Sequence, residues 1–243
     1  INWRRFFDIN TLAALRVEDE AVFDTVHATI FRLYAAGLID GVRIDHVDGL
    51  ADPRGYCRRL RARLRKLSLR RPATAPRGEA LIVVEKILAP HERLEQDWQV
   101  DGSSGYSFMN EVSALLHDGR GEPLLTRMWL DCSGAEFIDE ERRARRRIAQ
   151  DLLAADLQAC AQALHRLARE SAQTRDWTLA AVRRVLIEIL VQFPVYRTYA
   201  DARGRRPADA EIMRQVVTAA AAQCRPSEVA LLEQVDRWLG AEP

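Results

Sequence analysis

Apolar and polar residues in the first half of the chain follow helical and strand-like patterns in turn. A stripe of apolar residues spaced four apart predicts an amphipathic helix that ends in a left-handed turn at Gly37. Its members are Val22, Val26, Ile30 and Tyr34. A short strand-like run, Gly41–Asp45, comes next. Further along, Leu81–Val84 is a continuous apolar run, which is typical of a strand buried on both faces of a parallel sheet.

A basic helix separates these two predicted strands. It extends from Arg54 to about Arg70, and a proline-rich breaker at 71–76 follows it. Its apolar side comprises Tyr56, Leu60, Leu64 and Leu67. Helices and parallel-type strands that alternate in this order indicate βα units, so the first half is predicted to be α/β.

From about residue 134 onward the pattern is nearly all helical. Two apolar stripes predict helices, the second with Asp176 as its N-cap, and two more helices are predicted to start at Pro207 and Pro226. The stripes are Ile148, Leu152, Leu157, Cys160, Leu164 and Leu167, then Trp177, Val182, Val185, Leu186 and Ile189. Residues 193–199 are predicted to be a strand or an extended crossing. We therefore expect one part at 1–125 that carries the βα units and a mainly helical part at 126–243.

Each of the two predicted strands ends in a carboxylate, Asp45 and Glu85. Active sites of parallel barrels lie at the carboxyl ends of the strands, where these two acids are expected to meet. A pair of carboxylates there suits retaining glycoside chemistry, in which one acid attacks the anomeric carbon while the other, held protonated, donates to the leaving oxygen. Arg43 lies two residues before Asp45, so on a strand it faces the same side and is expected to keep that carboxylate ionised and oriented. From spacing alone, an acid at the end of a strand is more often a helix cap or a solvated loop residue than a catalyst. His46 is equally compatible with a loop histidine, and Asp48–Gly49 is an ordinary turn signal.

Composition narrows the range of functions. There are 36 Lys+Arg residues against 35 Asp+Glu, so the net charge of +1 argues against a dedicated nucleic-acid binder. Two arginine tracts, 58–65 and 142–147, keep a basic-helix nucleic-acid-binding module as a distant alternative. Leucines at helical spacing make the first tract an amphipathic helix with a solvated basic face, and three acids at 139–141 offset the second.

Other patterns bear on the cellular setting. No apolar run approaches the roughly 20 residues that cross a bilayer, and the chain opens on Ile1 without a signal-peptide pattern. We therefore expect no membrane partner and a cytoplasmic location. The cysteines share no CxxC spacing, so we expect reduced thiols and no metal site or disulfide. They are Cys57, Cys132, Cys160 and Cys224.

Five segments carry a family resemblance. The segment Gly41-Val-Arg-Ile-Asp-His46 resembles the nucleophile-bearing signature of the α-amylase superfamily of retaining glycoside hydrolases and transglycosylases. More narrowly, the chain resembles the maltooligosyltrehalose synthase family in several motifs that occur in the same order. These motifs are residues 2–10, 40–53, 83–88, 101–108 and 193–199. The chain departs from the family pattern at Trp3 and at Ser103–Ser104. It also departs at Ser107, and at that position alone the family usually has an acid.

The resemblance implies roles for individual residues. Asp45 carries over as the nucleophile, Glu85 as the general acid/base and Arg43 as the partner of the nucleophile. The residues implied to contact the sugar are His46, Lys86, Arg4, Arg5, Asp8 and Tyr106, for the last of which a structural role is the alternative. No metal or organic cofactor is implied.

The reaction implied by the resemblance is an intramolecular transglycosylation of a maltooligosaccharide. The α-1,4 bond at the reducing end becomes an α,α-1,1 bond, and an α-glucan hydrolase or another transglycosylase of the superfamily is the alternative. The third acid of the superfamily matches nothing in this chain, and the first residue is not Met. The expected fold is therefore a partial (β/α)8 (TIM) barrel with a mostly helical inserted subdomain, helix-rich overall. The isolated piece is expected to be inactive, and its oligomeric state is left open.

Overall fold

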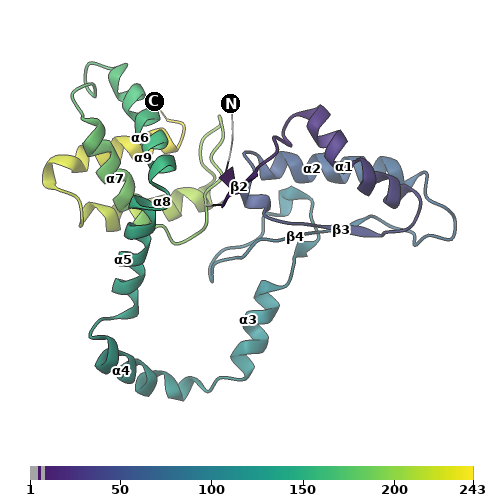
Figure 1. Cartoon of the computed structure of the whole chain (residues 1–243), viewed down its shortest axis with the longest axis horizontal. Coiled ribbons are helices and arrows are strands. Elements are labelled where there is room, and N and C mark those ends of the chain that lie inside the picture. Colours follow the sequence, from purple (N-terminus) through teal and green to yellow (C-terminus); the bar gives the residue numbers. More distant parts are fainter. Residues whose placement is uncertain (1–4, 7–8, 243) are drawn as a thin grey trace. The chain divides into compact units, whose positions relative to one another are not determined.

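The computed structural model describes residues 5–6 and 9–242, and the chain divides into two compact units, Ile1–Asp118 and Gly119–Pro243 (Figure 1). The elements of the first unit are β1 (Arg5–Phe6), β2 (Ile9–Ala13), α1 (Glu20–Ala35), β3 (Gly41–Ile44), α2 (Pro53–Ser68), β4 (Leu81–Val84), β5 (Gly102–Ser103) and α3 (Tyr106–Leu115). Short 3-10 turns occupy Val47–Gly49 and Gln96–Trp98. Strands β1 and β2 pair antiparallel.

Strands β3, β4 and β5 form a parallel sheet in that order. Gly41 pairs with Leu81 and Ile44 with Val84, so β3 and β4 end at the same level. The predictions of two parallel strands at 41–45 and 81–84 are therefore confirmed. Ser103 of β5 also pairs with Val84, which brings a third strand end to the same edge.

Helix α1 buries a different face from the one the sequence predicts. Its buried residues are Phe23, His27, Phe31 and Tyr34, while Val26 is 44% exposed. The buried face thus begins one residue later than the predicted stripe, because the large aromatic rings remove more apolar area from water than the valines do. His27 fits this face since both ring nitrogens have partners 2.7 Å away, the carbonyl oxygen of Phe23 and the hydroxyl of Tyr56. The predicted left-handed turn at Gly37 is confirmed by its φ of 74°.

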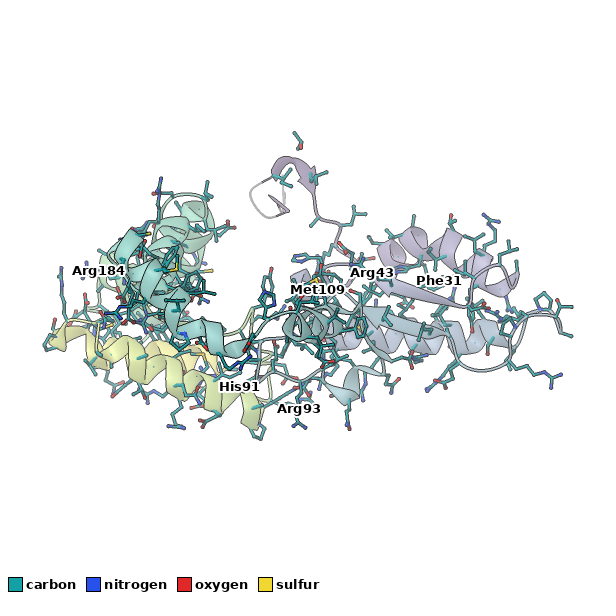
Figure 2. All side chains as sticks on the ribbon, turned by 90° about the horizontal axis from the view of Figure 1, so that it is seen from below. Phe31, Arg43, His91, Arg93, Met109 and Arg184 are labelled. Carbon is teal, nitrogen blue, oxygen red and sulfur yellow. The ribbon has the colours of Figure 1, made fainter. Side chains whose placement is uncertain are left out.

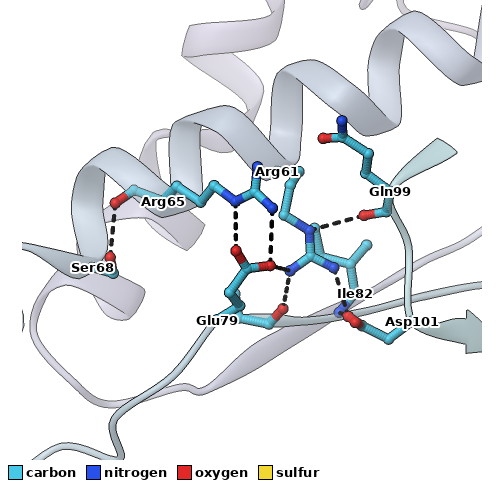
Figure 3. Close-up of polar contacts among 8 residues, drawn as sticks. Arg61, Arg65, Ser68, Glu79, Ile82, Gln99 and Asp101 are labelled. Carbon is cyan, nitrogen blue, oxygen red and sulfur yellow. Dashed lines mark hydrogen bonds and ion pairs between the residues drawn. The ribbon is translucent and has the colours of Figure 1, made fainter. Parts of the chain in front are cut away.

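Helix α2 follows the predicted pattern, with one correction. Asp52 caps it by accepting a hydrogen bond of 2.8 Å from the amide of Gly55, and Leu60 and Leu64 are fully buried. The arginine tract, however, is not uniformly solvated, because Arg61 is only 2% exposed. Its guanidinium donates to the carbonyl oxygens of Ala80 and Gln99 and to the carboxylate of Asp101 (Figure 3).

The two helices cover one face of the sheet and form the core of this unit with it. The core comprises Phe23, Phe31, Tyr34, Leu60, Leu64, Ala80 and Ile82, with Val42 and Ile44 packed against it. Figure 1 shows α1 and α2 on the same side of β3 and β4. The reader can locate Phe31, on α1, and Arg43, on β3, by their labels in Figure 2. The opposite face is more open, since Leu81 and the side chain of Arg43 are both about half exposed.

The second unit is helical. Its helices are α4 (Glu122–Ser133), α5 (Phe137–Gln150), α6 (Ala154–Arg169), α7 (Leu179–Gln192), α8 (Pro207–Ala221) and α9 (Val229–Leu239). Helix α7 is central to the core, with Val182, Val185 and Leu186 buried among residues of α6, α8 and α9. The predicted start at Pro207 is confirmed, and Pro226 opens a 3-10 turn that leads into α9.

Two predictions for this unit are wrong. The stripe 148–167 does not belong to one helix, because the chain turns at 151–153 and leaves Ile148 and Leu152 exposed. The N-cap of α7 is Thr178, whose hydroxyl accepts from the amide of Ala181, and not Asp176. Residues 193–199 form neither a helix nor a strand, so of the two alternatives predicted there the strand is excluded and the extended crossing stays a prediction. The assignment of 1–125 and 126–243 to a barrel and an inserted subdomain stays a prediction.

Candidate active site

The carboxyl ends of β3 and β4 bring two acids to one edge of the sheet. Asp45 and Glu85 directly follow Ile44 and Val84, the last paired residues of the two strands. The amide of Glu85 donates to the carbonyl oxygen of Ile44 at 2.7 Å, so the parallel ladder continues to the acids themselves. Side chains alternate along a strand, and the register therefore sets Asp45 and Glu85 on the same face. This is the face opposite α1 and α2.

The backbone between the two acids is held by a direct contact. The amide of His46 donates to Oε2 of Glu85 at 3.1 Å, so the Glu85 carboxyl group lies against the peptide that follows Asp45. His46 has a φ of 49°, a left-handed conformation that is uncommon for a residue with a side chain. A Cβ at Gly49 would lie 2.3 Å from Cδ2 of the His46 ring, so a larger residue there requires that ring to move.

Arg43 is the nearest cation to Asp45 in the sequence, and the two side chains meet. Nη1 of Arg43 lies 2.8 Å from Oδ1 of Asp45, as their spacing of two on one strand predicts. Both side chains are well exposed, at 47% and 67%. An exposed pair of this kind contributes only about 0–1 kcal/mol to stability, so its main consequence is the orientation of the carboxylate.

Lys86 follows Glu85 and points to the other side. Its side chain is 1% exposed, and Nζ lies 3.0 Å from Oδ2 of Asp48 and 2.7 Å from Oε1 of Glu92. Glu92 also accepts a hydrogen bond of 3.1 Å from the amide of Ala89. Sequence reasoning missed both partners, since Asp48 was assigned to an ordinary turn and Glu92 carries no motif. The rarity of lysine in this chain was the one available signal.

The third strand end adds polar groups to this edge. The amide of Ser104 donates to the carbonyl oxygen of Val84 at 2.9 Å, and Tyr106 then begins α3 after Gly105, which has a φ of 99°.

Asp101, just before β5, accepts from the amide of Ile82 and from Arg61, both at 2.7 Å. Burial raises the pKa of Asp101, but these two hydrogen bonds and the Arg61 charge outweigh it, and the net effect is a lowered pKa.

Some predicted site residues have no described position. Arg4 and Asp8 lie outside the described residues, and so does the side chain of Arg5. Within the part of the chain that is described, no three His, Cys, Asp or Glu side chains are grouped so as to hold a metal ion. No helix in that part is long and apolar enough to cross a membrane.

Cys57 is the cysteine that lies in the same compact unit as the two acids. Cys57, on α2, is fully buried, and burial together with the charges of Asp52 and Asp48 raises the pKa of its thiol to about 12. Because the thiolate is the reactive form, this cysteine is not a nucleophile at neutral pH. The two carboxylates are therefore the candidate reactive groups at this edge.

Comparisons with known proteins identify relatives of this chain. No family model matches the chain. Two curated relatives, from two strains of Mycobacterium tuberculosis, carry the name maltooligosyl trehalose synthase. Each is 42% identical to this chain over 179 residues, which cover 74% of this chain and 20% of the relative. The solved structure of maltooligosyltrehalose synthase from Arthrobacter ramosus matches 99% of this chain and 28% of its own, with a TM-score of 0.79 and 33% identity.

A more distant structure gives the same result. The Sulfolobus tokodaii protein described as a hypothetical maltooligosyl trehalose synthase matches with a TM-score of 0.68 and 27% identity, over 98% of this chain and 29% of its own. The chain thus spans between a fifth and three tenths of the length of these proteins. By sequence and by structure, this chain is a relative of the maltooligosyltrehalose synthases.

Proposed function

We propose that this chain forms the part of a maltooligosyltrehalose synthase that carries its nucleophile and its general acid/base. The observation that carries the proposal is the convergence of Asp45 and Glu85 at the ends of adjacent parallel strands, with the His46 amide bonded to Glu85. The names of its relatives supply the substrate class, a maltooligosaccharide, and the reaction, which leaves trehalose at the chain end. The proposal includes no metal and no organic cofactor.

The proposed mechanism is a retaining double displacement. Glu85 protonates the glycosidic oxygen at the reducing end while Asp45 attacks the anomeric carbon, which breaks the α-1,4 bond and forms a β-glycosyl-enzyme ester. The released glucose stays bound and turns. Glu85, now a carboxylate, takes the proton from its anomeric hydroxyl as that oxygen attacks the ester, which regenerates Asp45 and forms the α,α-1,1 bond.

Neighbouring residues support these roles. Arg43, at 2.8 Å, holds Asp45 in one orientation. The residues proposed to contact the sugar are His46, Tyr106, Arg4, Arg5 and Asp8. A closed pocket that excludes water is needed to favour transfer over hydrolysis.

We also propose that the three parallel strands are consecutive strands of a (β/α)8 barrel. Their order along the sheet equals their order in the chain, and α1 and α2 cover one face, as in βα units. The apolar side chains of α3 are uncovered in this chain, with Phe108 69% and Leu115 85% exposed, which fits a helix that packs on further polypeptide. On this proposal the isolated 243 residues are inactive, and the natural polypeptide that contains them is cytoplasmic.

Product analysis tests the reaction. The natural polypeptide that contains these residues is incubated with maltopentaose, and we expect a pentasaccharide without a reducing end. Release of glucose and maltose in its place would identify an α-glucan hydrolase and refute the synthase assignment.

The roles of the two acids are tested separately. We expect Asp45→Ala and Glu85→Ala each to abolish turnover, while Asp139→Asn, an exposed acid on α5, leaves it unchanged. With an α-maltosyl fluoride donor, azide is expected to restore reaction in both variants. The Asp45 variant should yield the β-azide, because azide replaces the missing nucleophile, and the Glu85 variant the α-azide, because azide attacks the glycosyl-enzyme. The opposite pair of anomers would reverse the two assignments.

A further inference from the structure

The loops after β3 and β4 are joined by a buried cluster of charges on the face that the helices cover. We infer that Lys86 is a positioning residue that fixes the separation of Asp45 and Glu85, with Asp48 and Glu92 as its anchors. This inference rests on the proposed function, because it concerns the same pair of acids. It differs from the sugar contact that the resemblance implies for Lys86.

The cluster connects the segments that carry the two acids. Asp48 lies three residues after Asp45, and Lys86 lies one residue after Glu85, so their contact at 3.0 Å links the two strand ends. On the opposite side, the amide of His46 bonds Glu85 directly at 3.1 Å. The backbone at 85–86 is therefore held from both faces of the sheet by the same three-residue stretch, 46–48.

Glu92 completes the cluster from the far side of the loop. One carboxylate oxygen lies 2.7 Å from Nζ of Lys86, and the other accepts from the amide of Ala89. The loop 86–92 thus closes around the lysine, whose side chain is only 1% exposed. A lysine held in this way is poorly placed to reach a sugar hydroxyl.

The energetics favour a geometric role over a stabilising one. Removing charges from water costs several kcal/mol per ion, and well-packed apolar residues often replace a buried ion pair with no loss of stability. One ammonium between two carboxylates is directional, whereas apolar packing is not. A retaining enzyme needs its two carboxyl groups about 5 Å apart, and a misplacement of about 1 Å can lower the rate by about 10²-fold.

The test compares the two lysines of the chain in the natural polypeptide. Lys86→Met removes the buried charge, and Lys66→Met, at an exposed position of α2, is the matched control. We expect kcat to fall by about 10²-fold for Lys86→Met with KM within about twofold, and no change for the control. A rise of KM at unchanged kcat would instead show direct sugar binding and overturn the inference.

A second readout separates positioning from loss of fold. A 5-fluoro glycosyl fluoride is expected to label Asp45 of the Lys86 variant to full stoichiometry but slowly, because every molecule is folded and misaligned. Substoichiometric labelling at the normal rate would show a merely structural role and overturn the inference. Asp48→Asn and Glu92→Gln keep the shape of the cluster, so if Lys86→Met fails to fold these two variants carry the same comparison, with kcat losses of about tenfold expected.

The same measurements distinguish failure of the synthase assignment from failure of the positioning role of Lys86. If the unmodified polypeptide forms no non-reducing product, the proposed function fails and the inference fails with it. If it forms that product and both Lys86→Met and Asp48→Asn retain full kcat, only the inference fails.

Discussion

Replacement of Arg61 by Met is predicted to loosen strand β4. The guanidinium donates to the carbonyl oxygens of Ala80 and Gln99, and its Nη2 lies 2.7 Å from the Asp101 carboxylate. Methionine fills a similar volume but donates nothing, so two carbonyl groups next to the strand lose their partner. A buried polar group left unsatisfied costs about 1–3 kcal/mol. This applies to the carbonyl oxygen of the buried Ala80, while Gln99 is exposed and the two acids nearby, 41% and 57% exposed, regain water. The expected loss is therefore about 2 kcal/mol, carried mainly by the Ala80 carbonyl group.

Hydrogen exchange of the purified chain, read by mass spectrometry of peptides, measures this effect where it occurs. A loss of about 2 kcal/mol lowers the protection of β4 amides by about 30-fold, provided they exchange through opening of this unit. Peptides from 179–192 in the other unit are the internal reference. Arg63→Met, an exposed arginine on the same helix, is the matched variant and should change protection little. A change of less than about threefold at residues 81–84 for Arg61→Met would refute the reasoning.

Three further outcomes are expected. Arg43→Leu should alter the chemical denaturation midpoint little, since an exposed ion pair contributes about 0–1 kcal/mol to stability. It should lower kcat/KM with maltopentaose by at least about tenfold, because Asp45 loses the bond that orients it. Equal activity of the variant would show that Arg43 does not belong to the site. Gly49→Ala should lower the melting temperature, because the new Cβ meets the His46 ring, whereas an unchanged value would show that the turn adapts freely. The pKa of Asp101 is lowered in the folded state, so its stabilising contribution is present above the ordinary value of 3.8 and is lost as pH falls below it. Asp101→Asn should therefore make the free energy of unfolding depend less on pH in the acid range. An identical pH dependence in the variant would contradict this.

Local patterns were sufficient for the elements that position the site. The strands at 41–44 and 81–84 and helix α2 were predictable because each is defined by its own apolar residues and flanking breakers. The Arg43–Asp45 contact was predictable too, since residues two apart on a strand share a face. The face of α1 was misjudged because His27 is polar in isolation and becomes a core residue only through Tyr56, which lies 29 positions away.

The burial of Arg61 and Lys86 could not be predicted from local patterns either, because their partners lie far from them in the sequence or outside any recognised element. Nothing in the arginine tract 58–65 distinguishes Arg61, whose partners come from residues 80, 99 and 101. Likewise, the partners of Lys86 lie 38 residues before it and six after it, in segments that show only turn signals. Burial of a cation depends on acceptors that the folded chain supplies, and a single sequence does not specify which residues these are.

Strand β4 is held at both of its ends by a buried cation on the helix-covered side. Arg61 bonds the carbonyl oxygen of Ala80, directly before the strand, and Lys86 is anchored directly after Glu85. Both cations act from outside the face that bears Asp45 and Glu85, so that face is left open to a substrate while the strand cannot slide or tilt easily. Because the two cations bind different segments, loss of either one is expected to displace Glu85 while its bond from the His46 amide still holds it to the neighbouring strand. A double variant of Arg61 and Lys86 should therefore lose more transition-state stabilisation than the sum of the single variants, since both cations that hold β4 from the helix-covered side are then missing.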